Sequence, residues 1–189
     1  MLRLAIFASF FLTLAGCASQ SATTAAAPAA STAADWSVVQ KQRLENLLQG
    51  TPYTLTEVEQ GWLIRIAEQG TFHPQRPELL LPAALGSIGQ ITRHLAQDQD
   101  IAVMVVGVAT GQYKLKSKEQ VSHERASSVA SIFRLNRVPG HRLKTLGVSH
   151  GEKIDKQLGV ALLVVPEQEL HARMANDSHG QMVAMLNSN

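Results

Sequence analysis

The only cysteine of this 189-residue chain, Cys17, directly follows a short apolar segment, and this limits which residues can build a fold. One positive charge, Arg3, precedes an apolar run from Leu4 to Leu14, and the small pair Ala15-Gly16 leads to the cysteine. A charged start, a short apolar middle and small residues at the end predict a secretory signal peptide over residues 1–16. The run is too short to cross about 30 Å of hydrocarbon as a helix. The folded part must therefore follow it.

The segment Leu14-Ala15-Gly16-Cys17 resembles the cleavage site of bacterial lipoproteins, which are cut before a cysteine whose thiol is lipidated. The alternative is a secreted protein with a cysteine there by chance. The next residue, Ala18, is not the aspartate that resembles an inner-membrane retention signal. The resemblance therefore implies an outer-membrane lipid anchor with the domain facing the periplasm. An acylated Cys17 leaves no thiol for a disulfide, so packing alone must stabilise the fold.

The residues between the cysteine and the first amphipathic segment predict a flexible connection. Ala18 to Ala34 consists of Ala, Ser, Thr and Pro with one Gln and no charge. Such a stretch cannot bury enough apolar surface to offset the entropy of ordering its backbone. We expect a lipidated cysteine and disordered tether over residues 17–35, although the alanines would also allow local helix. As a random coil this tether would span about 20–25 Å.

The remainder, about Asp35 to Pro166, is long enough for one domain with a core. A net charge of +2 is too small to indicate a nucleic-acid partner. Hydrophobic periodicity and turn residues predict helices and strands in alternation. The expected elements are a helix over 36–50, a hairpin of 53–58 and 62–67, a loop over 72–77, a helix after Pro82, a strand over 101–106, a helix over 117–136, strands over 142–148 and 160–165, and a polar tail over 167–189 with a short helix near 167–175 followed by disorder.

Strands that alternate with helices favour one mixed sheet with both long helices on the same face. We therefore predict an α+β domain with about four to five strands over residues 53–166, preceded by the helix and the tether.

Four short segments, in order and at matching spacing, resemble the OmpA-like domain of peptidoglycan-associated lipoproteins. The resemblance covers roughly residues 53–165. The segments are Phe72 with Glu78-Leu79 in place of "FDSGSAEL", Gly107 to Thr110 in place of "G-H-T-D", Val121 to Ala126 in place of "L-S-x-x-R-A", and Ser149 to Glu152 in place of "G-Y-G-E".

In that family an aspartate and an arginine hold the diaminopimelate residue of the peptidoglycan stem peptide, because a carboxylate pairs with its ammonium and a guanidinium with its carboxylate. The resemblance implies that Thr110, Arg125, Ser122 and Gly107 form this site. Thr110 replaces the aspartate, and a threonine cannot neutralise an ammonium. Loss of one partner of such a pair costs about 2–5 kcal/mol, which predicts weak binding. Arg125 could also be a structural residue that pairs with an acid inside the fold.

Three other patterns in the sequence allow different interpretations. Gly147 to Gly151 fits G-x-S-x-G, the turn that exposes the serine nucleophile of some hydrolases, but a strand follows where that turn requires a helix. The seven histidines form no metal-binding spacing. Arg134, Arg137, Arg142, Lys144 and the lysines at 114–118 could form a basic face or be ordinary solvated charges. We expect no enzymatic activity, no cofactor and no metal.

Two functions follow. The first is an outer-membrane lipoprotein that attaches the envelope through weak, non-covalent binding to peptidoglycan. The second is a degenerate OmpA-like scaffold that binds a protein partner in a larger envelope machine, for secretion or motility.

Overall fold

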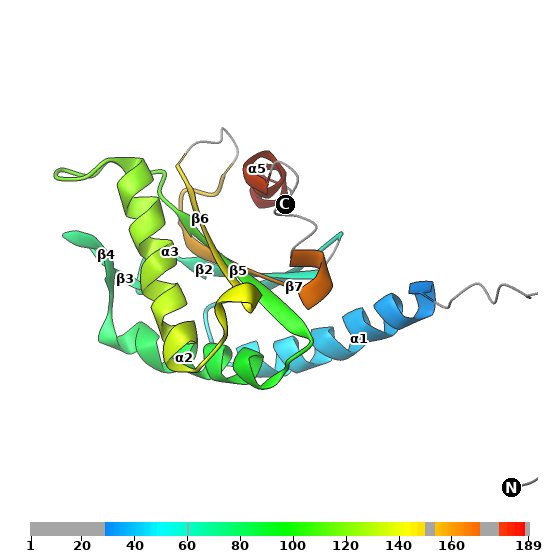
Figure 1. Cartoon of the computed structure of the whole chain (residues 1–189). Helices are drawn as coiled ribbons and strands as arrows, with labels where there is room; N and C mark the ends of the chain where they lie inside the picture. The colour runs from blue at the N-terminus through cyan, green and yellow to red at the C-terminus, as the bar shows by residue number, and fades with distance from the viewer. Residues whose placement is uncertain (1–28, 60, 150–153, 171–177, 188–189) are drawn as a thin grey trace, which may run out of the picture.

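The computed structural model of the protein describes residues 29–59, 61–149, 154–170 and 178–187 (Figure 1). A helical turn at 167–170 follows the last strand. The helices are α1 (Ala29–Leu48), α2 (Pro82–Gln97), α3 (Lys118–Leu135), the 3-10 turn η1 (Gly140–Arg142) and α5 (Ser178–Asn187); the strands are β1 (Thr54–Val58), β2 (Gly61–Ala67), β3 (Phe72–His73), β4 (Arg76–Leu80), β5 (Ile101–Val108), β6 (Leu143–Val148) and β7 (Leu158–Pro166).

The main sheet has five strands in the order β1-β2-β7-β5-β6. Strands β5 and β6 are parallel, and the other neighbours are antiparallel. The centre of the sheet is set by β5 and β7, where Val105 lies opposite Leu162. All eight residues of β5 are buried, because protein covers both faces of this strand. The predicted mixed α+β sheet is thus confirmed.

One face of the sheet carries the larger core. Alternate residues of β5 and β7, such as Val103, Val105 and Leu162, pack there against the buried sides of α2 and α3. Leu44 and Leu48 bring α1 onto the same core. The expectation that both long helices lie on one face is therefore confirmed, and α1 joins them.

The opposite face is also covered, and this corrects the expectation of a disordered tail. Met104, Val106 and Leu163 point to this second core, which includes Met182 and Leu186 of α5. Both α5 side chains are about 1% exposed. Because Met182 and Leu186 are four residues apart, they lie on the same side of the helix, and the sheet shields both from water. The tail sequence as a whole is polar, which is why it predicts no such packing. Residues 171–177 of the tail prediction lie outside the described residues.

Two further expectations differ from the structure. The predicted loop over 72–77 contains the small antiparallel pair β3–β4, whose turn is held by His73: its Nδ1 accepts hydrogen bonds from the backbone N–H groups of Gln75 and Arg76. Helix α1 begins at Ala29, inside the predicted tether. Alanine has the highest helix propensity, so these residues extend the helix already favoured over 36–50.

The amino end of α3, the helix that carries Ser122 and Arg125, is fixed by local hydrogen bonds. Ser117 is the N-cap and accepts a hydrogen bond from the backbone N–H of Gln120, whose side chain accepts one from the Ser117 N–H. This capping box satisfies two N–H groups that the first turn leaves free. It sets the direction in which α3 passes over β5.

Candidate functional site

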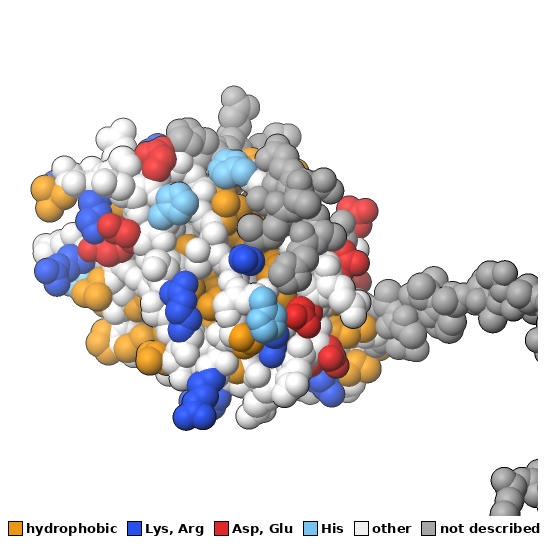
Figure 2. All heavy atoms as spheres, in the orientation of Figure 1, with side chains coloured by type: hydrophobic (Ala, Val, Ile, Leu, Met, Phe, Trp, Pro, Cys, Tyr) orange, Lys and Arg blue, Asp and Glu red, His pale blue; other side chains and the backbone are white. Residues whose placement is uncertain are grey.

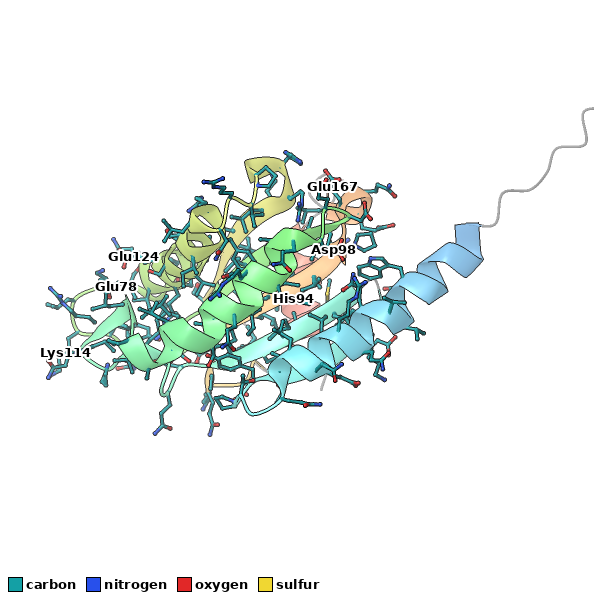
Figure 3. The ribbon with its side chains drawn as sticks, turned by 90° about the horizontal axis from the view of Figure 1, so that it is seen from below. Glu78, His94, Asp98, Lys114, Glu124 and Glu167 are labelled. Carbon is teal, nitrogen blue, oxygen red and sulfur yellow. The ribbon has the colours of Figure 1, made fainter. Side chains whose placement is uncertain are left out.

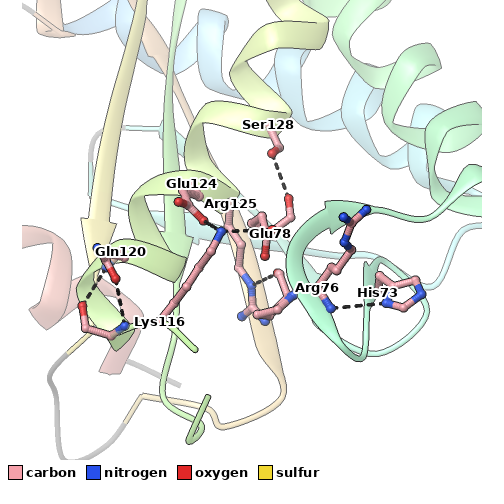
Figure 4. A network of polar contacts seen from close by, with 10 residues as sticks. His73, Arg76, Glu78, Lys116, Gln120, Glu124, Arg125 and Ser128 are labelled. Carbon is pink, nitrogen blue, oxygen red and sulfur yellow. Dashed lines mark hydrogen bonds and ion pairs between the residues drawn. The ribbon is translucent and has the colours of Figure 1, made fainter. Parts of the chain in front are cut away.

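Arg125 projects from α3 into the interior, and its side chain is 0% exposed. Its Nε donates to the carbonyl of Pro77 at 2.7 Å (Figure 4), and its Nη1 donates to the carbonyl of Val108 at 2.7 Å. The carboxylate of Glu68 pairs with both terminal nitrogens of the guanidinium, with Nη1–Oε2 at 3.1 Å and Nη2–Oε1 at 2.5 Å. A planar fork against a carboxylate is the strongest pairing that an arginine makes.

Two aromatic rings close the space around this pair. The Arg125 guanidinium carbon lies 4.9 Å from the centre of the Phe72 ring and 5.5 Å from that of Tyr113. Burial raises the pKa of the Tyr113 hydroxyl above its ordinary value, even though the nearby arginine acts in the opposite direction. The donors of Arg125 thus face Glu68 and two backbone carbonyls. This is the arrangement that the structural role considered for Arg125 requires.

Glu68, the residue that sequence reasoning missed, directly follows β2. Its backbone N–H donates to the carbonyl of Gln157 at 2.6 Å, and its own carbonyl accepts from the N–H groups of Thr71 and Phe72. This tight turn fixes the carboxylate beneath Arg125. An acidic residue at the end of an apolar strand was the available signal, but nothing local indicates that its partner lies 57 residues further on.

Gly107 and Ser122 meet at the crossing of β5 and α3. A Cβ at Gly107 would lie 1.8 Å from the Ser122 carbonyl oxygen, so only glycine permits this approach. Ser122 is 1% exposed, and its hydroxyl donates to the carbonyl of Glu119 at 2.9 Å. Both predicted site residues therefore serve the contact between helix and sheet. Thr110, half-buried just past β5, is the more accessible of the four.

Beside this cluster lies an open pocket of about 580 Å³. Its walls are the β3–β4 turn and the loop between β5 and α3, and its lining contains neither Thr110 nor Arg125. The residues that line it include Arg76, Glu78, Tyr113, Lys114 and Leu115.

A polar network joins the pocket walls to α3 (Figure 4). Lys116 lies 3.0 Å from Glu78 Oε1 and 2.5 Å from Glu124 Oε2. These two partners, Glu124 foremost, raise the pKa of Lys116 above its ordinary value. Burial alone would raise the pKa of the Glu78 carboxyl, but its backbone N–H, Lys116 and Arg76 together hold that pKa below its ordinary value. Both groups are therefore charged at neutral pH.

The remaining candidates do not assemble into a reactive site. Ser149, the serine of the G-x-S-x-G pattern, donates to Glu119 Oε1 at 3.0 Å; His150, Gly151 and His171 lie outside the described residues. Within the described ranges, no three His, Cys, Asp or Glu side chains are grouped as a metal site would require. Arg142 is 6% exposed and so does not belong to a basic face. On the face shown in Figure 2, the Lys and Arg side chains are scattered among uncharged and acidic ones.

A scan against protein-family models and a search of curated proteins found no match to this sequence. The fold, however, is similar to solved structures. A MotB-like protein from Desulfovibrio vulgaris has a TM-score of 0.60 at 13% identity, over 71% of this chain and 99% of that chain. The periplasmic domain of Helicobacter pylori MotB has a TM-score of 0.55 at 14% identity, over 68% and 91%.

The cell wall anchor of the T6SS from Pseudomonas aeruginosa also has a TM-score of 0.55 at 14% identity, over 66% of this chain and 94% of that one. At these identities the likeness shows the fold alone. The five-stranded mixed sheet with its helices is the OmpA-like fold of these periplasmic domains. Cys17 lies outside the described residues, and over the described residues no helix is long and apolar enough to cross a membrane.

Proposed function

We propose that this protein is a lipid-anchored periplasmic domain that attaches the outer membrane to the cell wall. Lipid at Cys17 would hold the amino-terminal end in the outer membrane, and the OmpA-like domain would contact peptidoglycan non-covalently and weakly. We propose no catalytic role.

The observation that carries this proposal is the placement of the two ends of the domain. The amino end of α1 projects from one side, whereas the β3–β4 pair and the loop before α3 lie at the other (Figures 1 and 3). Helix α1 has 20 residues, or about 30 Å at 1.5 Å per residue. An anchor at the amino end would therefore leave the pocket at the end of the domain opposite the attachment, where it can meet the cell wall.

A purified full-length protein in detergent tests the cell-wall part of this proposal. It should co-sediment with isolated peptidoglycan sacculi, and excess soluble muropeptide should release it. A supernatant that retains all of the protein would contradict cell-wall attachment.

Cys17→Ser tests the anchor separately. The variant should move from the membrane fraction to the soluble periplasmic fraction and should lose incorporation of labelled palmitate. A variant that remains fully in the membrane fraction would contradict lipid anchoring. Ala15→Ser, which leaves the cysteine in place, is the matched control.

The second function, a scaffold in a multiprotein envelope machine, is favoured by a different observation. Glu68 fills the guanidinium fork of Arg125, and Thr110 offers no charge for an ammonium. Both facts argue against diaminopimelate binding at these residues. A scaffold would give no sedimentation with sacculi, but crosslinking of intact envelopes would retrieve one defined protein partner.

A further inference from the structure

We propose that the pocket between residues 74–78 and 112–116 binds a carboxylate-bearing peptide, and that in the envelope this peptide is the peptidoglycan stem. The inference rests on the proposed cell-wall attachment and moves the contact from Thr110 and Arg125 to the neighbouring pocket. Its volume of about 580 Å³ lies within the range of small-ligand sites.

Both walls of this pocket are held in place by α3. Ser128 donates to the Glu78 carbonyl at 2.9 Å, and Arg125 donates to the Pro77 carbonyl at 2.7 Å, so the β4 wall is tied at successive residues. Lys116, which ends the opposite wall, is tied to β4 through Glu78 and to α3 through Glu124. A peptide would therefore meet a preformed site and would pay little ordering entropy.

The charges of the pocket favour an anion. Lys116 is balanced by its two carboxylates. Arg76 and Lys114 are both exposed, and neither lies in an ion pair with a carboxylate of the described residues. Arg76 also lies near the Glu78 carboxylate, so the three cations Arg76, Lys114 and Lys116 stand against the two carboxylates Glu78 and Glu124. This excess of positive charge attracts a negatively charged group, and the Arg76 guanidinium can bind a carboxylate through two parallel hydrogen bonds.

The other pocket atoms indicate that the anion is part of a peptide. Glu78 Oε2 is buried and has no hydrogen-bond partner among the described residues, so it can accept from an N–H group of a ligand after a small side-chain movement. Leu115 is 92% exposed beside the half-buried Tyr113. A large apolar side chain on a loop next to a pocket provides a contact for the aliphatic part of a peptide.

Figure 2 shows basic, acidic and apolar side chains together at the end of the molecule where this loop lies. Lys114 and Glu78 occupy the same end in Figure 3, away from α1. The pocket thus lies at the end of the domain opposite the amino-terminal attachment.

The test compares full-length parent protein with a double charge reversal, Arg76→Glu with Lys114→Glu, in sacculus co-sedimentation. Because both side chains are exposed, the variant should fold with unchanged circular dichroism. Its affinity should fall about tenfold, or about 1.4 kcal/mol, because both reversals replace attraction of the anion by repulsion. The matched control, Arg93→Glu with Arg134→Glu, makes the same change in net charge at exposed cations of α2 and α3 and should bind as the parent does.

The outcomes separate the two proposals. Equal sedimentation of parent and double variant would overturn the pocket while cell-wall attachment stands. If both double variants lose affinity equally, the loss follows from net charge alone, and the assignment of the ligand to this pocket is also overturned. If the parent itself does not sediment, cell-wall attachment fails, and the stem peptide as occupant fails with it.

A second measurement identifies the source of the carboxylate. Soluble stem tetrapeptide should shift the NMR signals of Tyr113 and Leu115 in the parent and leave them unmoved in the Arg76/Lys114 variant. If an acidic peptide of unrelated sequence binds the pocket as tightly, the cell-wall peptide is not the specific occupant, and that part of the inference is wrong.

Discussion

Two buried arginines lie at opposite ends of β5, and their environments differ. Arg142 lies at the beginning of the strand: its Nε donates to the Ile101 carbonyl at 2.7 Å, and its Nη2 donates to the carbonyls of Asp98 at 2.5 Å and Leu95 at 3.4 Å. No carboxylate of the described residues pairs with it. Arg125, at the end of the strand, has two carbonyls and a carboxylate as well.

The difference shows what each end of the strand requires. Arg142 lies at the carboxyl end of α2, where the helix carbonyls and their dipole stabilise a positive charge without a carboxylate. Arg125 has only two carbonyls, those of Pro77 in β4 and Val108 at the end of β5, so Glu68 supplies the remaining compensation. A buried arginine in this fold therefore does not require a carboxylate partner. Arg125 has one where fewer backbone carbonyls reach the guanidinium than at Arg142.

Arg125→Ala should have the largest effect on stability. It removes a fully buried guanidinium and leaves the carbonyls of Pro77 and Val108 without partners, so the free energy of unfolding should fall by about 3–5 kcal/mol. Urea denaturation followed by circular dichroism would measure the change. A loss below 1 kcal/mol would show that solvent replaces the arginine easily.

Arg142→Ala should destabilise the domain by about 2–3 kcal/mol, since hydrogen bonds from a charged group to three carbonyls are lost. The same denaturation experiment measures it. Arg142→Lys, which keeps the charge but not the planar fork, should recover only part of the loss. If Arg142→Ala proves more harmful than Arg125→Ala, the contrast drawn between the two ends is wrong.

Glu68→Gln should cost about 1–2 kcal/mol, because the amide keeps a hydrogen bond to Arg125 but removes the opposing charge. Glu68 is partly exposed, and solvent screens some of the effect. Glu124→Gln is the control: it weakens an exposed pair with Lys116 and should cost less than about 1 kcal/mol. Equal effects of the two variants would indicate that the Glu68 pair is an ordinary surface ion pair.

The smallest effect concerns the two tyrosines of the chain. Burial raises the pKa of both Tyr53 and Tyr113 above 10.0. Folding thus favours the neutral phenols, and this stabilisation is complete below the unfolded pKa and is lost as the pH rises through the higher folded values. Tyrosinate absorbance at 295 nm should therefore appear at lower pH in denaturant than in the folded protein. Tyr113→Phe should leave one such transition, and a normal titration in the folded protein would contradict the burial of both rings.

Much of the fold was predictable because its signals are local. The hairpin of β1 and β2, the helix beginning at Pro82 and the strand at Ile101 follow from periodicity and turn residues over a few positions. The pair β3–β4 was missed, since two prolines over 72–77 indicate a loop and the strands are short. Helix α5 was missed because the tail as a whole is polar, and the short apolar run from Met182 to Leu186 is a weak signal until the sheet face that it covers is known.

The site was less predictable. The sequence singled out Arg125, Gly107 and Ser122, and the structure brings all three to the crossing of β5 and α3, but as packing residues. The partner Glu68 and the pocket with Arg76 and Lys114 depend on contacts between distant segments. No local pattern carries that information.

The sequence by itself determined the α+β class and the order of the long helices and of the strands of the main sheet, and it predicts an anchored, single-cysteine chain, because hydrophobic period and charge act over neighbouring residues. Only the tertiary structure decided that the guanidinium of Arg125 meets Glu68 rather than solvent, and that two other cations face an open pocket. These pairings depend on which side chains from distant segments meet in space. In the interior, where water is excluded, an unpaired charge is far more costly than at the surface.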